Sequence, residues 1–243
     1  MIIGLPLFVV VFFVLTILFT LFLFYRVIKK SPQNVISSKA NVLLIVLSLW
    51  IIVQAILGLN FVFSSDTTVF PPKIAIMGVF PAILSIMLVF LTRGGRKFID
   101  GLPILNLTYL HVGRIPVEII LYLLFINGTV PELMTFEGRN FDILAGISAP
   151  LVAYFGISKK KMAKGSLLAW NVICFCLLIN IVANAFLSVP SPIQKFGFDQ
   201  PNIAVLYFPF SLLPAFIVPV MFFSHLVSIR QLLMNKVRVI DAN

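Results

Sequence analysis

Charged residues are scarce in this chain, at 11% of its 243 positions, whereas soluble domains typically carry about 25%. Hydrophobic residues make up 60% of the sequence, and its 25 phenylalanines are spread along the whole length. A soluble protein of this size must leave much of its surface in water and could not hide so many large apolar side chains. The composition therefore excludes an ordinary soluble domain and indicates an integral membrane protein.

Cysteine and the common catalytic motifs are also lacking. Cys174 and Cys176 lie in one apolar run, and in a helix their side chains would point about 200° apart, so we expect no disulfide between them. The sequence contains no P-loop, GxSxG, CxxC or HExxH motif, and the last apolar run has no lysine to hold retinal. No known enzyme chemistry is indicated, and no cofactor is predicted.

The long apolar runs predict an all-α bundle of transmembrane helices that forms a single domain over residues 1–243. A spanning helix needs roughly 20 predominantly apolar residues. The sequence offers seven such stretches, approximately 3–26, 40–63, 74–92, 103–127, 140–157, 166–188 and 203–230. The connections between them are short and polar, which favours the inner (plasma) membrane of a bacterium.

The net charge of +10 reflects topology rather than nucleic-acid binding, because the basic residues form short clusters between the apolar runs. With the N-terminus outside and the C-terminus in the cytoplasm, only Lys73, Arg139 and Lys195 fall outside, and Arg114 falls within a helix. The remaining 14 of the 18 basic residues fall on the cytoplasmic side: Arg26, Lys29, Lys30, Lys39, Arg93, Arg96, Lys97, Lys159, Lys160, Lys161, Lys164, Arg230, Lys236 and Arg238. This asymmetry predicts the orientation and allows contacts with anionic lipid at the cytoplasmic face.

The fourth predicted helix carries a polar stripe where polar groups are costly. Ionisable groups at mid-membrane are candidates for function, since each costs several kcal/mol unless it faces the bundle interior. Pro116 should kink this helix, and Arg114 and Glu118 are spaced to pair along it. The stripe lies within about 120° of the helix circumference and contains Thr108, His111, Arg114, Glu118 and Tyr122. These residues form either a substrate or proton site or an internal ion pair that only fixes the helix.

The outer half of the bundle is expected to be wetter than the inner half. Asp142 begins the fifth helix, and Asn180 and Asn184 lie on one face of the sixth. We interpret these three residues as an outer vestibule above the charged stripe. The alternative is that each amide makes an interhelical hydrogen bond worth about 1 kcal/mol.

The two histidines of the chain fall at similar predicted depth. His225 lies shortly before Arg230 in the seventh helix, and His111 enters the fourth helix from the same side. Two histidines on facing helices could bind a haem iron, or with Glu118 they could bind a transition metal. The alternative is a pair of hydrogen-bonded packing histidines.

Three functions remain open from the sequence. A small-solute or proton-coupled transporter (permease) would use His111, Arg114, Glu118, Tyr122 and the vestibule. A haem or metal redox protein would use His111 and His225. A membrane receptor or assembly factor would present the polar stripe to a partner helix. We favour transport, with the lipid bilayer, anionic lipid at the cytoplasmic face, and a small molecule or ion as the expected partners, and with no nucleic acid among them.

Overall fold

The structure is a computed structural model that describes residue 2 and residues 4–235. Within this part of the chain every regular element is a helix and none is a strand, which confirms the all-α class. Lys236 and Arg238, which the orientation argument counts, lie outside the described residues.

Five helices are long and apolar enough to cross a membrane, and a sixth qualifies if a bent pair is one span. The bent pair is Ala75–Leu91, composed of η1 (Ala75–Val79) and α4 (Phe80–Leu91), followed at 90° by α5 (Arg93–Asp100). A shorter apolar helix, Ile143–Ser158, combines α8 (Ile143–Leu151) with η4 (Val152–Ser158). The five are α1 (Leu7–Lys29), α2 (Asn34–Ser37) with α3 (Ala40–Leu59), α6 (Ile104–Leu110) with η2 (His111–Gly113) and α7 (Arg114–Ile126), α9 (Lys164–Ser188), and η6 (Leu213–Ile217) with α10 (Val218–Leu233).

Each of the seven predicted ranges overlaps one of these helices, but the last range begins too early. The structure starts that helix at Leu213, whereas 203 was predicted. Residues 204–206 form the short η5 (Ala204–Leu206), and Tyr207 and Pro209 lie in an irregular segment before the helix. Prolines supply no N–H to a helical ladder, so an apolar sequence alone does not keep this segment helical.

Several helices change their hydrogen-bonding pattern next to a proline. The fourth predicted helix, in which Pro116 was expected to cause a kink, contains the 3-10 turn η2, which ends shortly before that proline. Pro150 lies within α8, which continues as the π-helix η4, and Pro214 lies in the π-helix η6. Because proline removes an N–H donor, the neighbouring turns re-form their bonds with 3-10 or π spacing.

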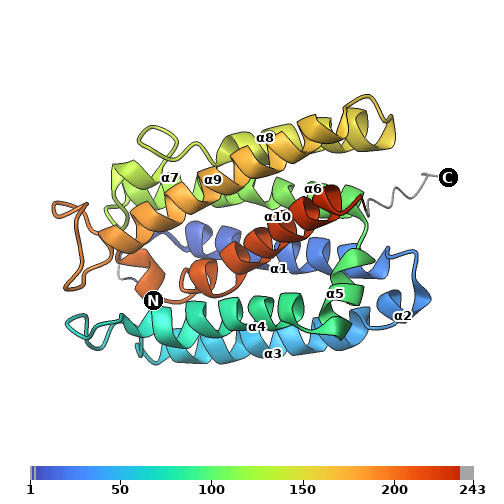
Figure 1. Ribbon diagram of the computed structural model, residues 1–243. Coiled ribbons are helices and arrows are strands. Elements are labelled where there is room, and N and C mark those ends of the chain that lie inside the picture. Colours follow the sequence, from blue (N-terminus) through green and yellow to red (C-terminus); the bar gives the residue numbers. More distant parts are fainter. Residues whose placement is uncertain (1, 3, 236–243) are drawn as a thin grey trace.

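The helices form a central layer with a pair on either side of it (Figure 1). Helices α1, α6, α7 and α10 occupy the centre, α8 and α9 lie on one side, and α3 and α4 lie on the other (Figure 1). The apolar stretch of α10 is 67% buried, whereas that of α3 is only 11% buried. Helix α10 is therefore the core of the bundle, and α3 is peripheral.

The outer surface is strongly apolar. Large side chains such as Ile45, Leu49, Ile52 and Ile56 on α3 are more than half exposed. Contiguous apolar surface of this kind is rare on soluble monomers but suits lipid. Together with the long apolar helices, it indicates a membrane protein.

Candidate functional site

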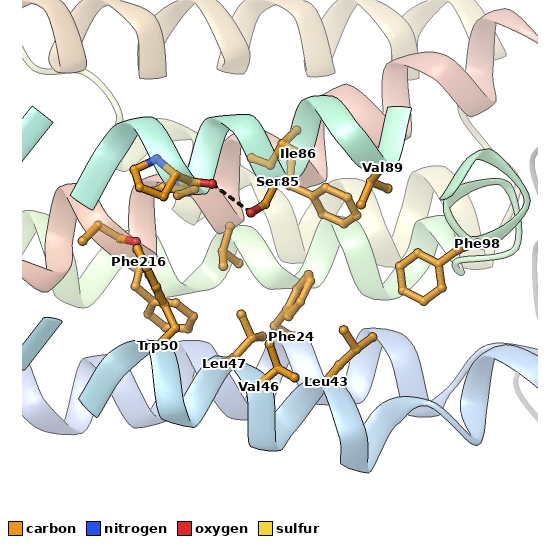
Figure 2. A pocket seen from close by; sticks show the side chains of 16 residues that line it. Phe24, Leu43, Val46, Leu47, Trp50, Ser85, Ile86, Val89, Phe98 and Phe216 are labelled. Atoms are coloured by element: carbon orange, nitrogen blue, oxygen red, sulfur yellow. Dashed lines mark hydrogen bonds between the residues drawn. The ribbon is translucent and has the colours of Figure 1, made fainter. Parts of the chain in front are cut away.

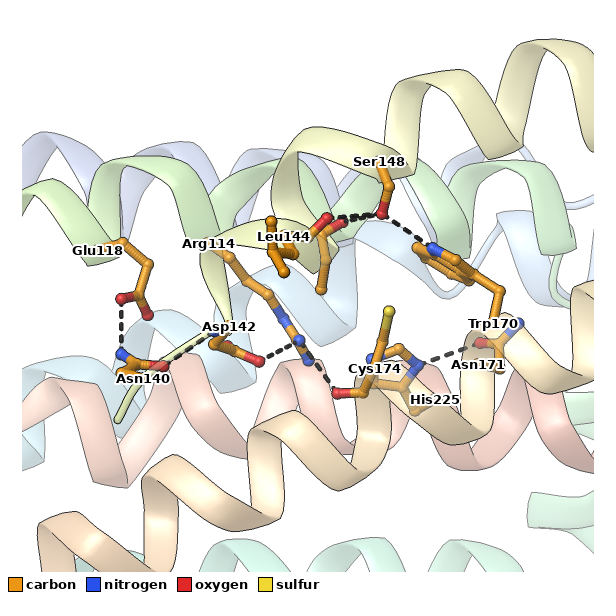
Figure 3. A network of polar contacts seen from close by, with 11 residues as sticks. Arg114, Glu118, Asn140, Asp142, Leu144, Ser148, Trp170, Asn171, Cys174 and His225 are labelled. Carbon is orange, nitrogen blue, oxygen red and sulfur yellow. Dashed lines mark hydrogen bonds and ion pairs between the residues drawn. The ribbon is translucent and has the colours of Figure 1, made fainter. Parts of the chain in front are cut away.

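A buried ion pair joins the broken helix α6–α7 to the start of α8. Nη1 of Arg114, the first residue of α7, donates to Oδ1 of Asp142 over 2.6 Å (Figure 3). The same nitrogen donates to the carbonyl oxygen of Cys174 in α9 over 3.4 Å. Arg114 is 2% exposed and Asp142 is 4% exposed. One guanidinium thus connects three helices in the buried interior of the bundle.

Arg114 does not pair with Glu118, as its sequence spacing had suggested. Oε2 of Glu118 instead accepts a hydrogen bond of 2.6 Å from Nδ2 of Asn140 (Figure 3). Nδ2 of Asn140 also donates to the carbonyl of Met134 over 3.0 Å, and its Oδ1 accepts from the backbone N–H of Asp142 over 3.0 Å. The Asn140 amide therefore links the Glu118 carboxyl group to the backbone of Asp142, whose own carboxylate lies beside Arg114.

The buried cluster contains two carboxyl groups, those of Glu118 and Asp142, but only one cationic side chain, that of Arg114. Among the described residues, Arg114 is the only buried cationic side chain, and Asp142 already provides its carboxylate partner. Glu118 is 1% exposed and makes its hydrogen bond to a neutral amide. An ionised carboxylate is costly to bury without a cation. Glu118 is therefore the one carboxyl of the cluster that has no direct counter-charge.

The two histidines meet in the core, as their similar predicted depth suggested. Their imidazole rings stack with 3.9 Å between centroids and 15° between planes. Both residues are fully buried, and the Trp170 ring lies 5.8 Å from His111 and 6.0 Å from His225, measured between centroids. The chain thus forms a compact aromatic cluster around its only histidines.

The hydrogen bonds of His225 define its tautomer. The amide nitrogen of Asn171 donates to the carbonyl of Leu167 over 3.0 Å, so its Oδ1 acts as acceptor. Nδ1 of His225 lies 3.1 Å from that oxygen and is therefore the protonated nitrogen (Figure 3). Nε2 of His225 and both ring nitrogens of His111 have no hydrogen-bond partner among the described residues.

This stacking does not fit the predicted alternative of a shared metal or haem iron. A metal ion binds about 2 Å from an imidazole nitrogen and in the plane of the ring. Two nearly parallel rings stacked face to face cannot both direct a nitrogen to one ion. In the part of the chain that the structure describes, no group of three or more His, Cys, Asp or Glu side chains could hold a metal ion either.

The polar side chains follow one another along the bundle. Figure 3 shows Glu118, Asn140, Asp142, Arg114, His225, Asn171 and Trp170 in sequence between the helices. Cys174, whose carbonyl binds Arg114, lies one turn of α9 from Asn171. At the far end Nε1 of Trp170 donates to Oγ of Ser148 over 2.9 Å. We call the seven residues that Figure 3 shows in sequence, together with His111, the polar row.

Other predicted site residues lie apart from the polar row. Asn180 is exposed and donates to the carbonyl of Arg139 over 2.9 Å, and Asn184 donates to Oδ1 of Asn180 over 3.2 Å. The ring of Tyr122 stacks on Phe136, with 5.1 Å between centroids. Of the predicted vestibule, only Asp142 belongs to the polar row.

Three members of the polar row, Asn140, Asn171 and Trp170, were absent from the predicted site. None of the three was singled out from the sequence. A signal for Asn171 exists, because the buried face of α9 contains Leu167, Asn171, Cys174, Leu178, Ile181, Asn184 and Ser188. Their spacing of three and four residues is that of one helix face.

Comparison with known proteins identifies a family without naming a function. A family described as a domain of unknown function (DUF8737) matches residues 71–233. The match covers more than half of the chain, and the chain therefore belongs to this family. No curated protein and no solved structure matches it. The matched residues include the whole polar row.

Proposed function

We propose that this DUF8737 member is a proton-coupled transporter of a small solute, in which Glu118 binds and releases the coupled proton. The supporting observation is that one buried carboxyl group has no cationic partner: Arg114 is neutralised by Asp142, and the Glu118 carboxyl group is hydrogen-bonded only to Asn140. A proton or a transported cation is the simplest species that balances such a carboxyl group in a membrane interior.

The direction of the polar row supports proton movement. Its members follow the long direction of the bundle, which in a membrane protein is the direction across the bilayer (Figures 1 and 3). Carboxyl, amide and imidazole groups in sequence form the kind of relay that pumps and transporters use. Several buried nitrogens of the row have no partner among the described residues, namely Nε and Nη2 of Arg114, both nitrogens of His111, and Nε2 of His225. These atoms can bind water or a polar solute.

The same proposal includes a seven-span topology, with the N-terminus outside and the C-terminus in the cytoplasm. It counts the shorter helix Ile143–Ser158 and the bent helix Ala75–Leu91 as spans. The last turn of α1, helix α5, and the end of α10 carry basic residues and lie at one end of the bundle, together with the start of α9 (Figure 1). Basic residues concentrated at one end favour a cytoplasmic position for that end. We place the protein in a bacterial inner membrane.

Proton flux into proteoliposomes tests this function. The purified protein is reconstituted with a trapped pH-sensitive dye, a potassium–valinomycin potential is imposed, and a panel of anionic, zwitterionic and neutral small solutes is added outside. We expect one class of solute to drive acidification of the lumen. Glu118→Gln should abolish this flux, because the amide preserves size but does not exchange a proton.

Glu137→Gln is the matched control, because Glu137 is an exposed glutamate in the loop before Asn140. It should transport like the parent. Infrared spectra of protein with isotope-labelled glutamate provide a readout that needs no substrate: a protonated carboxyl band should titrate in the parent and disappear in Glu118→Gln. A parent protein without solute-driven flux and without such a band would refute the proposal.

A further inference from the structure

An apolar groove separates helix α4 from the rest of the bundle. Its volume is about 310 Å³, and its walls come from α1, α3, α4, α5 and the η6–α10 helix. Figure 2 shows Trp50 and Phe216 towards one end, Phe24 and Leu47 in the middle, and Phe98 of α5 at the other end. The groove lies away from the polar row, so it belongs to a different part of the molecule.

The groove offers almost no polar group to an occupant. Nε1 of Trp50 donates to the carbonyl of Ala215 over 2.9 Å, and Oγ of Ser85 donates to the carbonyl of Pro81 over 2.8 Å (Figure 2). Both polar side chains of the lining are thus satisfied by backbone oxygens. An occupant of the groove would be held by apolar contact alone, as a hydrocarbon chain is.

Helix α4 is fixed by hydrogen bonds and a close backbone approach at its two ends, whereas along its middle only partly buried side chains such as Ile86 pack against the core. None of the side chains of α4 is buried. At one end, Nε2 of Gln54 in α3 donates to the carbonyl of Met77 in η1 over 3.0 Å, and a Cβ at Gly78 would lie 3.1 Å from that of Ala215. This close approach holds η1 against η6.

At the other end α5 is fixed to α10. Nε and Nη2 of Arg230 donate to the carboxylate of Asp100 over 2.9 and 3.3 Å. Nε2 of Gln231 donates to the carbonyls of Ile99 and Leu102 over 2.7 and 2.8 Å. The position of α4 relative to α3 and α10, and with it the width of the groove, is therefore fixed by contacts at both ends of the helix.

Helix α5 places positive charge beside the end of the groove. It turns by 90° from α4 and runs across the bundle, with Thr92 as its N-cap (Figure 1). Phe98 lines the groove and Ile99 is buried, whereas Arg93 and Lys97 are exposed and Arg96 is partly exposed. An amphipathic helix of this kind lies in the membrane interface, with its basic face at the level of lipid head groups.

We propose that the groove is a specific site for an anionic phospholipid of the surrounding bilayer. An acyl chain occupies the space between α3 and α4, and the phosphate lies against Arg93, Arg96 and Lys97. The argument is one of complementarity: the apolar space and the basic helix meet at Phe98, as the chain and the phosphate of a lipid meet. A neutral lipid would match only the apolar part.

The two tryptophans of the chain make this site directly measurable. Trp50 lines the groove and Trp170 does not. A Trp170→Phe protein, in which Trp50 is the only fluorophore of its kind, is reconstituted in phosphatidylcholine vesicles. Phosphatidylglycerol with brominated acyl chains is titrated in, and brominated phosphatidylcholine is titrated separately, because bromine quenches tryptophan fluorescence on contact.

We expect the anionic lipid to quench Trp50 at a lower mole fraction than the neutral lipid. Arg93→Gln, Arg96→Gln and Lys97→Gln should each reduce this preference by up to about fivefold. The matched controls are the single substitutions Lys159→Gln, Lys160→Gln and Lys161→Gln, which remove one charge each elsewhere at this end of the bundle. They should leave the preference for the anionic lipid unchanged. Ala82→Phe, which fills the groove, should weaken quenching by both lipids, whereas Leu84→Phe on the exposed side of α4 should not.

Equal quenching by both lipids, or a preference that survives loss of the α5 charges, would mean ordinary annular contact and would overturn the proposal. The reciprocal Trp50→Phe protein reports on Trp170 and should show no anionic preference. If Trp170→Phe does not fold, subtracting the Trp50→Phe signal from that of the parent gives the same measurement.

Discussion

The imidazole rings of His111 and His225 lie face to face, 3.9 Å apart between centroids, although they come from different helices far apart in the sequence. His111 hydrogen-bonds to no described residue, so its contribution to the stability of the fold comes from packing against His225 and Trp170. The stack joins η2, the break in the α6–α7 helix, to α10 at the centre of the bundle.

We predict that this stack stabilises the folded protein through the close packing of its flat rings and not through hydrogen bonds of the ring nitrogens. His111→Ala should lower the free energy of unfolding by on the order of 3 kcal/mol, because it leaves a cavity in the core. His111→Phe keeps a flat ring and should cost less than about 1.5 kcal/mol. Reversible unfolding in mixed micelles measures both values. Equal losses in the two variants would show that a nitrogen atom, and not the ring shape, is what matters.

Metal removal should have no effect on the fold. Since the stacked rings cannot share an ion, incubation with a strong chelator should leave the melting temperature in detergent unchanged. The purified protein should also show no haem absorption band. A melting temperature that falls with chelator and recovers with one added metal would contradict this prediction.

Breaking the Arg114–Asp142 pair should be costly in a way that removing both charges is not. Asp142→Leu leaves a guanidinium buried without a carboxylate partner and should cost about 3–5 kcal/mol of unfolding free energy. Combining it with Arg114→Met should recover part of that loss, since no unpaired charge remains. A double-mutant cycle measures the coupling. Strictly additive losses would mean that the two side chains act independently.

A close approach between α7 and α8 should depend on Gly146. A Cβ there would lie 2.8 Å from Cγ1 of Ile115 and 3.2 Å from its backbone nitrogen, so Gly146→Ala should cost about 1–3 kcal/mol through overpacking. At Gly165 in α9 nothing lies within 4 Å of an added Cβ, and Gly165→Ala should be neutral or slightly stabilising. Thermal unfolding of the two variants measures this difference. Equal melting temperatures would show that α7 and α8 leave room for a Cβ at Gly146.

The proposed orientation can be tested from outside the cell. In a background with Cys174→Ala and Cys176→Ala, we expect Val69→Cys to react with a membrane-impermeant thiol reagent in intact cells and Lys161→Cys to react only after lysis. Both residues are exposed, Val69 in the connection between α3 and η1 and Lys161 in that between η4 and α9. These two connections lie at opposite ends of the bundle (Figure 1). The reverse pattern of labelling would invert the topology.

The sequence was most informative about the positions of the helices, because the hydropathy of a segment largely decides whether it forms a helix in a membrane. Long apolar runs predicted the helices well, because in lipid a backbone must satisfy its own hydrogen bonds and a helix does so locally. The predicted start at 203 was wrong because Pro209 and its surroundings interrupt the helical ladder within an apolar stretch. Hydropathy describes where a segment can reside, not whether each of its residues is helical.

That His111, Arg114 and Glu118 lie inside the bundle was also predictable, because ionisable groups in an apolar run are conspicuous. Their partners were not. Arg114 pairs with Asp142, Glu118 bonds to Asn140, and His225 bonds to Asn171. Each partner lies on another helix, and the positions of helices relative to one another depend on packing throughout the bundle.

By itself, therefore, the sequence determined that the chain is an all-helical membrane protein with a few charges in its interior, since composition and hydropathy act residue by residue. Only the tertiary structure decided which of those groups meet, that the two histidine rings stack face to face, and that α4 stands apart from α3 across an apolar groove. These features arise between helices, from side-chain shape and the end anchors of η1 and α5, and no local pattern in the sequence encodes them.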